Sequence, residues 1–578
     1  MNKTIKSMLL LALAAVGLGT LNSCSDDDDS TMSRLFRPVL SNSNIITGLD
    51  AEKVPYLELK WDSYADADKY VAVLVPSNGG DSIVITTDTS TCRFNNLAYD
   101  AEYLIKLKAI STKRSLESKF YQTSVTTADY PTMLNNFTSS TIIDTQAKAT
   151  WDADGGKTRY DLLKLFKEST GEHIQDIVVT DADLAAGQIF ISNLEPKTTY
   201  RLEAYYNGKY LGKKRFTTTA PENYDGYVFD MRGMDDKESE RFISTETLDS
   251  IVSHNPGTDV TIVLKGGMSY KISGGTTIPA MANKIKFVTG LSLSGNATII
   301  STGGMTIGKD GADVKEIVFE KINFISDKAR DMESLYDNTD KGWGGRQVFN
   351  INGVKSTVET LTFKNCSITG YRAVVRGQTA NDHIHNIKME DCVVNAIGDQ
   401  GVFTNADKGG DWRNVSLKNC TFTNIVMLCD FRKTVNPLEM NVENCTFCYA
   451  PMETNANANT PLFRFGANPV TLNVKNTLFG PAMASEESAG GAILPYRAGV
   501  IGSVLMNATA TTAIVLNSYK TNFIYTDFGT EEAPKTYPIE GVETLNMSET
   551  QLWSNPGEGN FKIIATLDAS NVGDSRWN

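Results

Sequence analysis

The stretch LTFKNCSITG at residues 361–370 is the main indication of the fold, because the chain repeats nearly the same phrase downstream. The other copies are IKMEDCVVNA (387–396), VSLKNCTFTN (415–424) and NVENCTFCYA (441–450). In each copy an Asn or Asp precedes a Cys, and apolar residues stand three positions before and two positions after that Cys. Each phrase therefore predicts one strand, a tight bend and a second strand.

Aligning the copies on the Cys extends the repeat in both directions. The Cys column contains Ile322, Cys366, Cys392, Cys420, Cys445 and Thr477, at steps of 25 to 44 residues. Steps of this size are typical of one coil of a solenoid, in which strands stack roughly 4.8 Å apart and like residues form ladders. The preceding column contains Lys321, Asn365, Asp391, Asn419, Asn444 and Asn476. Asn tolerates the left-handed backbone of a tight bend, and Cys fills a small buried position.

An Asn ladder at a tight bend resembles the pectate-lyase-like superfamily of right-handed parallel β-helices. The stretch STETLDSIVSHNPGTDVTIVLKGGMSY (244–270) predicts a helix that is capped near Ser244, followed by a strand. A short amphipathic helix before a strand is similar to the N-terminal cap of that superfamily. The resemblance implies a right-handed parallel β-helix with a C-terminal cap over residues 221–578.

Two earlier segments, residues 36–128 and 129–220, read as short strands with a shared plan. Each has an early Trp, a Tyr-led strand and a later Leu-x5-Tyr, namely Trp61, Tyr70, Leu97 and Tyr103, then Trp151, Tyr160, Leu194 and Tyr200. This plan resembles two fibronectin type III domains, with the Trp in the core and the late Tyr at a corner. The expected fold class is all-β: two fibronectin type III-like β-sandwiches followed by a right-handed parallel β-helix.

The N-terminus predicts export and anchoring. Residues 1–23 combine two lysines with an apolar run, which is typical of a signal peptide, and Leu-x-Ser before Cys24 resembles a bacterial lipobox. The acidic linker 24–35, with Asp26–Asp29, resembles the export signal of Bacteroidota-type surface lipoproteins. The resemblance implies acylation of Cys24 and a lipid-anchored protein on the outer membrane, exposed at the cell surface.

Charge and cysteine spacing restrict the partners. The formal net charge of −13 disfavours nucleic acid, because a nucleic-acid-binding face is strongly basic. Cys445-x2-Cys448 has no second pair, so no structural metal is expected from the cysteines.

The strand after each repeated phrase carries the candidate site. Stacking these strands places Phe349, Val375, Phe403, Cys429 and Phe463 in an inward column. The next column, expected to face outward, contains Asn350, Arg376, Thr404, Asp430 and Arg464, and Arg346, Arg372 and Arg432 lie close to it in sequence. Guanidinium groups bind carboxylates in bidentate fashion, so this column suits an anionic or hydroxyl-rich ligand. The alternative is a surface ion-pair ladder such as Asp430 beside Arg464.

Inserted loops are expected to reach the same face. The long loop 326–346 contains Tyr336 and Trp343, which could stack on sugar rings, although Trp343 could equally pack as a lid over the coil. Asp399 and Asp407 lie on other inserted turns. His383 and His385 are interpreted as an exposed edge, since two histidines without a third ligand are weak evidence of a metal site.

The tail FKIIATLDASNVGDSRWN (561–578) is similar to that of lipoproteins with fibronectin-like modules and a β-helix, which resemble products of polysaccharide-utilisation systems. The hypothesis is therefore capture of an acidic, pectin-like polysaccharide, with a transporter as a further partner. One alternative is a polysaccharide lyase that cleaves a uronate glycan by β-elimination, with Arg376 or Arg464 as base and Asp430 near a calcium ion. No other cofactor is expected. A second alternative is a structural or adhesive surface protein.

Overall fold

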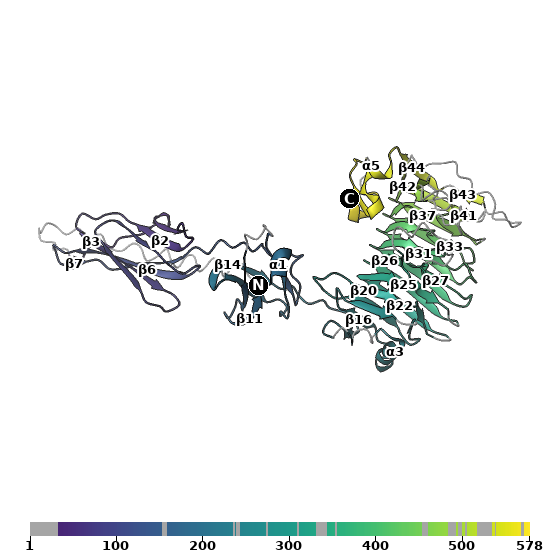
Figure 1. Ribbon diagram of the computed structural model, residues 1–578, viewed down its shortest axis with the longest axis horizontal. Coiled ribbons are helices and arrows are strands. Elements are labelled where there is room, and N and C mark those ends of the chain that lie inside the picture. Colours follow the sequence, from purple (N-terminus) through teal and green to yellow (C-terminus); the bar gives the residue numbers. More distant parts are fainter. Residues whose placement is uncertain are drawn as a thin grey trace, which may run out of the picture. The chain divides into compact units, whose positions relative to one another are not determined.

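The fold is described from a computed structural model. It covers residues 33–578 except 153–158, 235–236, 238–242, 273–274, 309–310, 331–343, 353–354, 453–460, 467, 484–492, 495–499, 503–505, 517–534, 538 and 568–570. The described chain is almost entirely β-structure, as the sequence predicts: fibronectin type III-like sheets precede a parallel β-solenoid (Figure 1).

The first fibronectin-like part consists of one sheet in the order β1-β2-β5 and another in the order β4-β3-β6-β7, with β8 also paired to β6. The strands are β1 (Ile45–Leu49), β2 (Pro55–Lys60), β3 (Lys69–Pro76), β4 (Ile83–Thr87), β5 (Thr91–Phe94), β6 (Glu102–Ser111), β7 (Leu116–Glu117) and β8 (Tyr121–Thr126). Trp61 packs on Tyr70 with ring centroids 5.3 Å apart, and the Tyr103 hydroxyl accepts from the Ala98 N–H at 3.2 Å. The early Trp and the corner Tyr therefore lie where the sequence pattern predicts.

The second fibronectin-like part has a four-stranded sheet in the order β11-β10-β13-β14 and a two-stranded sheet of β12 and β9. Its elements are β9 (Ala147–Thr150), β10 (Leu162–Lys167), β11 (His173–Val178), α1 (Asp181–Ala186), β12 (Gln188–Ile191), β13 (Thr199–Tyr206) and β14 (Lys209–Thr217). Trp151 meets Tyr160 edge-on at 5.5 Å, and Tyr200 stacks on Phe216 at 5.6 Å. The same aromatic plan is used twice.

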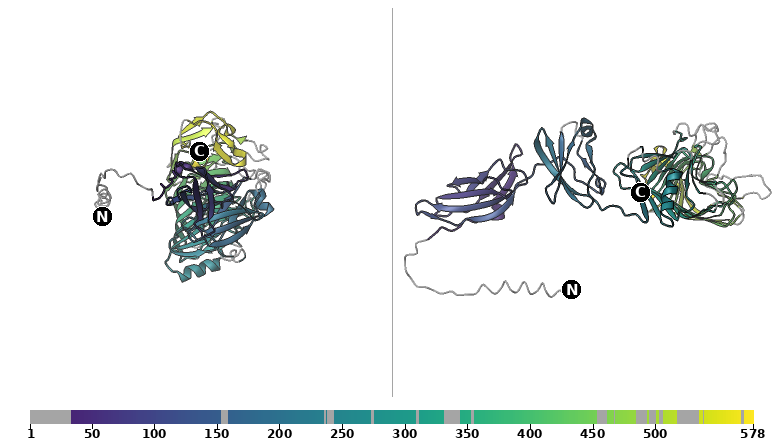
Figure 2. Two further views of the ribbon diagram at one scale, coloured as in Figure 1. Left: turned by 90° about the vertical axis from the view of Figure 1, so that its left-hand side faces the viewer. Right: turned by 90° about the horizontal axis from the view of Figure 1, so that it is seen from below.

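Near the start of the solenoid lies helix α3 (Thr245–His254), whose N-cap Ser244 accepts from the Thr247 N–H. The helix buries Leu248, Ile251 and Val252, the apolar stripe of the sequence pattern. Strands then stack turn on turn in parallel, as Figures 1 and 2 show.

Each turn places two strands in a large sheet and a third in a smaller one. Nineteen described strands form the large sheet: β15 (Tyr227–Asp230), β16 (Val260–Leu264), β17 (Ser269–Ile272), β19 (Lys284–Thr289), β20 (Ala297–Ser301), β22 (Asp313–Glu320), β23 (Ile322–Ser326), β25 (Thr357–Lys364), β26 (Ser367–Thr369), β28 (His383–Glu390), β29 (Val393–Ile397), β31 (Trp412–Lys418), β32 (Thr421–Ile425), β34 (Leu438–Glu443), β35 (Thr446–Cys448), β37 (Val470–Lys475), β38 (Leu478–Phe479), β42 (Met506–Leu516) and β44 (Glu540–Leu545). Nine described strands form the smaller sheet: β18 (Thr276–Ile278), β21 (Met305–Ile307), β24 (Gln347–Ile351), β27 (Ala373–Gly377), β30 (Gly401–Thr404), β33 (Cys429–Phe431), β36 (Phe463–Phe465), β41 (Val500–Gly502) and β43 (Lys535–Tyr537).

The predicted register is confirmed. Phe319, Phe363, Met389, Leu417, Val442 and Val474 are partners on successive turns and are buried. The column two positions after the Cys is buried as well, and its Phe422, Phe447 and Phe479 rings stack 5.0 and 5.2 Å apart. The seven described cysteines are unpaired and buried, and the Cys366 and Cys392 N–H groups donate to the Sγ of the next cysteine at 3.5 and 3.4 Å.

Every residue of the predicted bend column is left-handed. The φ angles run from 48° to 56° over Lys321, Asn365, Asp391, Asn419, Asn444 and Asn476. The turns are joined there by backbone hydrogen bonds, for example from the Asn419 N–H to the Glu443 carbonyl at 2.9 Å. A second left-handed column, which the sequence pattern did not reveal, contains Gly370, Ala396, Asn424 and Tyr449.

The last eight residues, 571–578, which we term the C-terminal strap, fold back across several turns beside the bend column (Figure 1). The Asp574 carboxylate accepts from the Thr421 hydroxyl at 2.7 Å, and the Ser575 N–H donates to Asn419 Oδ1 at 2.6 Å. Trp577 Nε1 also donates to the Thr421 hydroxyl at 2.7 Å. The strap is preceded by α5 (Glu549–Leu552), β45 (Trp553–Asn555) and β46 (Asn560–Ile563), whose Leu552, Trp553 and Phe561 are buried.

Candidate functional site

The predicted outward column lies on the smaller sheet, and we term it the arginine row. It comprises the register partners Asn350, Arg376, Thr404, Asp430 and Arg464, on β24, β27, β30, β33 and β36. The preceding column, with Phe349, Val375, Phe403, Cys429 and Phe463, is fully buried. Strand alternation therefore fixes which side chains can face a ligand.

Each arginine of this region contacts a carboxylate. Arg376 Nε donates to Asp407 at 3.0 Å, Arg372 binds both oxygens of Asp399 at 2.7 and 2.9 Å, and Arg346 Nε donates to Asp327 at 3.0 Å. These aspartates lie on the connections between strands, so the inserted turns do reach the face where the arginines lie. Planar, bidentate pairs hold a guanidinium group in one orientation.

Asp430 is the centre of the row. Its two carboxylate oxygens accept from Arg432 Nε and Nη2 at 2.8 Å each, and Arg464 Nη1 lies 3.7 Å from Oδ2. The Asp430 side chain is only 6% exposed, whereas that of Arg432 is 45% exposed. Burial lowers the pKa of Arg464. The positive charge of Arg432 also lowers this pKa, whereas the negative charge of Asp430 raises it.

Two predicted ligand contacts, Tyr336 and Trp343, lie outside the described residues, as does Cys24. The remaining predicted residues, Arg346, Arg372, Arg376, Asp430, Arg432 and Arg464, are described. Among the described residues no group of three or more His, Cys, Asp and Glu side chains is arranged to hold a metal ion.

The interpretation of His383 and His385 as an exposed edge is wrong. The His385 side chain is 15% exposed, its Nδ1 lies 2.6 Å from the Glu359 carboxylate, and its Nε2 lies 3.4 Å from Asp411. The Asp411 N–H donates to His383 Nδ1 at 3.0 Å. The reason is tertiary: Glu359, His385 and Asp411 come from three successive turns that the parallel stacking brings together.

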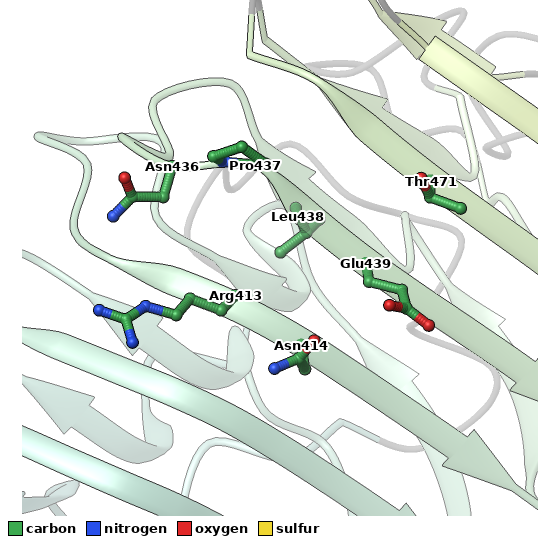
Figure 3. A pocket seen from close by; sticks show the side chains of 7 residues that line it. All are labelled: Arg413, Asn414, Asn436, Pro437, Leu438, Glu439 and Thr471. Atoms are coloured by element: carbon green, nitrogen blue, oxygen red, sulfur yellow. The ribbon is translucent and has the colours of Figure 1, made fainter.

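This network borders an open surface pocket that the residue pattern did not reveal, which we term the β31–β34 cavity. Its volume is about 490 Å³, and Figure 3 shows the side chains that line it: Arg413, Asn414, Asn436, Pro437, Leu438, Glu439 and Thr471. The sequence signal for this cavity is a column of register partners on the large sheet, made of Asn386, Asn414, Glu439 and Thr471.

Solved structures that are similar to part of this chain include segments of fibronectin type III domains. A segment of two fibronectin type III domains from chicken tenascin is similar over 32% of this chain and 100% of that segment, with 16% identity and a TM-score of 0.16. The FN1–FN3 domains of chicken CNTN1 are similar over 32% of this chain, with 13% identity and a TM-score of 0.14, and the likeness spans 65% of that structure. No family model and no curated protein matches the chain. In the described part of the chain, no helix has the length and apolar character needed to cross a membrane.

Proposed function

We propose that the arginine row captures an acidic polysaccharide at the cell surface. The observation that carries the proposal is the local excess of positive charge on a chain of net charge −13. Among the described residues, the carboxylates of Asp327, Asp399, Asp407 and Asp430 pair with five arginines, namely Arg346, Arg372, Arg376, Arg432 and Arg464. Lys433 Nζ donates to the backbone carbonyl of Asp407 at 3.0 Å.

A polymer suits this arrangement better than a small anion. The row repeats once per turn along the solenoid, at about 4.8 Å per strand, so an extended glycan can meet several turns at once. Paired guanidinium and carboxylate groups offer both donors and acceptors to carboxyl and hydroxyl groups of a sugar. Tyr336 and Trp343, on the adjoining loop, are proposed to stack on ring faces.

A polysaccharide lyase is the second candidate, and Arg464 is the observation that favours it. Burial lowers the pKa of this guanidinium group, whereas the Asp430 carboxylate, 3.7 Å away, raises it. In this alternative Arg464 takes the proton beside a uronate carboxyl, and cleavage leaves an unsaturated chain end. Arg376 would then neutralise the carboxyl.

Retention of the full chain on immobilised polygalacturonate tests the proposal. Arg376→Ala combined with Arg464→Ala should reduce retention at least tenfold and leave the melting temperature nearly unchanged. The matched control, Arg34→Ala with Arg37→Ala, removes the same charge from the exposed N-terminal segment and should retain binding. Equal retention of wild type and the row variant would mean that the row is only a surface ion-pair ladder.

Incubation of the wild type with soluble polygalacturonate, with and without calcium, separates the two candidates. Retention without new unsaturated ends supports capture. Unsaturated ends that the row variant no longer releases would establish the lyase instead.

A further inference from the structure

The β31–β34 cavity is a separate site from the arginine row. Its side chains come from β31, β34 and β37 of the large sheet and from the loop before β34, whereas the arginine row is on the smaller sheet. A volume of about 490 Å³ is within the range of roughly 300–1,000 Å³ typical of small-molecule sites. What the cavity can bind follows from the groups that line it.

Two of the lining side chains are held at the ends of one hydrogen-bonded network. Arg413 Nε donates to the Asp411 carboxylate at 3.0 and 3.1 Å. The Asp411 carboxylate lies 3.4 Å from His385 Nε2, and His385 Nδ1 lies 2.6 Å from the Glu359 carboxylate. From the other end, Asn414 Nδ2 donates to Asn386 Oδ1 at 2.8 Å, and Asn386 Nδ2 donates to the Glu359 carboxylate at 3.1 Å.

This network orients two of the side chains that line the cavity. The Asp411 side chain is 8% exposed and holds the guanidinium group of Arg413, whose own side chain is 50% exposed. Because Asn414 donates to Asn386, its carbonyl oxygen is turned away from that bond and can accept. A preorganised site loses little side-chain entropy on binding.

The lining favours a neutral ligand rich in hydroxyl groups. The charged side chains in the lining are Arg413 and Glu439, one of each sign. Glu439 would therefore repel an anion, and Arg413 would repel a cation. Glu439 Oε1 accepts from Asn441 Nδ2 at 2.9 Å, which orients the carboxylate. Guanidinium, amide, carboxylate and hydroxyl groups together supply donors and acceptors for adjacent hydroxyls, and Pro437 adds an apolar wall.

We propose that the β31–β34 cavity binds a neutral sugar residue through Arg413, Asn414 and Glu439. The site is independent of polysaccharide capture by the arginine row and would remain if that function failed. The chain would then carry two glycan sites of different charge preference on two faces of one solenoid.

Saturation-transfer NMR on the full chain tests this inference, with glucose, galactose, mannose, xylose, arabinose and rhamnose as probes and galacturonate for comparison. At least one neutral sugar should give a signal. Asn414→Ala and Glu439→Ala should each weaken its affinity at least tenfold. Ser416→Ala, on the same exposed side of β31 but outside the cavity, is the matched control and should bind like the wild type.

The row variant, Arg376→Ala with Arg464→Ala, should bind the neutral sugar normally, which separates this site from the proposed function. Asn414 and Glu439 are exposed, and thermal unfolding verifies that both variants fold. The inference is overturned if no neutral sugar binds, if only galacturonate binds, or if both cavity variants bind like the wild type.

Discussion

Left-handed backbone at one position of every turn explains the Asn column. An L-residue pays about 1–2 kcal/mol for this conformation, and Asn pays less because its short side chain bonds locally. Asn419 illustrates this: its φ is 55°, its Nδ2 donates to Asp391 Oδ1 at 2.5 Å, and its Oδ1 accepts from the Ser575 N–H. One residue therefore joins the bend, the neighbouring turn and the C-terminal strap.

Asn419→Leu should lower the free energy of unfolding of the solenoid by about 2–4 kcal/mol, because it adds backbone strain and removes two hydrogen bonds. Asn419→Gly keeps the left-handed backbone and should cost about 1–2 kcal/mol less than Leu. Calorimetric unfolding measures the free-energy change of both variants.

Asn424 is no suitable control, since its backbone is also left-handed and its side chain is buried. Ser416→Leu, exposed in a strand, should change stability by less than about 0.5 kcal/mol. Similar losses for Asn419→Leu and Asn419→Gly would contradict the role of backbone strain.

At the scale of elements, the C-terminal strap depends on a carboxyl group that it buries. Asp574 is 0% exposed and bonds to the Thr421 hydroxyl and to Arg576. Burial raises its pKa more than hydrogen bonds from Arg576 and Thr421 lower it. The folded state therefore keeps this proton to a higher pH than the unfolded state does. The contribution of Asp574 to stability falls as the pH rises from about 4, which is the ordinary pKa of Asp, through the pKa of the folded state.

Asp574→Asn should flatten this part of the pH dependence, because the amide has no charge to bury. Asp574→Ala should lower the free energy of unfolding by about 1–3 kcal/mol at every pH, since Thr421 and the Arg576 N–H lose their acceptor. The melting temperature of the solenoid, measured between about pH 4 and pH 7, distinguishes the two variants. An unchanged slope in Asp574→Asn would exclude Asp574 as the titrating group.

At the scale of the whole molecule, the proposed lipid anchor involves residues outside the described part of the chain. If Cys24 is acylated as proposed, Cys24→Ala should abolish lipidation and remove the protein from the outer-membrane fraction, as metabolic labelling with a fatty-acid analogue would measure. Replacing Asp26–Asp29 with Ala should keep the lipid and reduce cleavage by protease added to intact cells. A lipidated Cys24→Ala protein would contradict the lipobox prediction.

The solenoid and the register of its turns could be predicted from the residue pattern. Strand alternation and a bend column are local properties, so aligning Cys366, Cys392, Cys420 and Cys445 placed Arg376, Asp430 and Arg464 correctly in one register column. The expectation that this whole column faces outward is wrong for Thr404 and Asp430, which are buried. The same local rules predicted helix α3 and its cap at Ser244.

The contacts between side chains of different turns and loops became known from the three-dimensional arrangement alone. Arg372 with Asp399, Arg376 with Asp407, and Glu359 with His385 join residues 26 to 31 positions apart. The strap joins Asp574 to Thr421 across 153 positions. Such contacts depend on the path of the irregular connections between strands and on which buried polar groups still lack a hydrogen-bond partner. Neither can be predicted from a repeat period in the sequence.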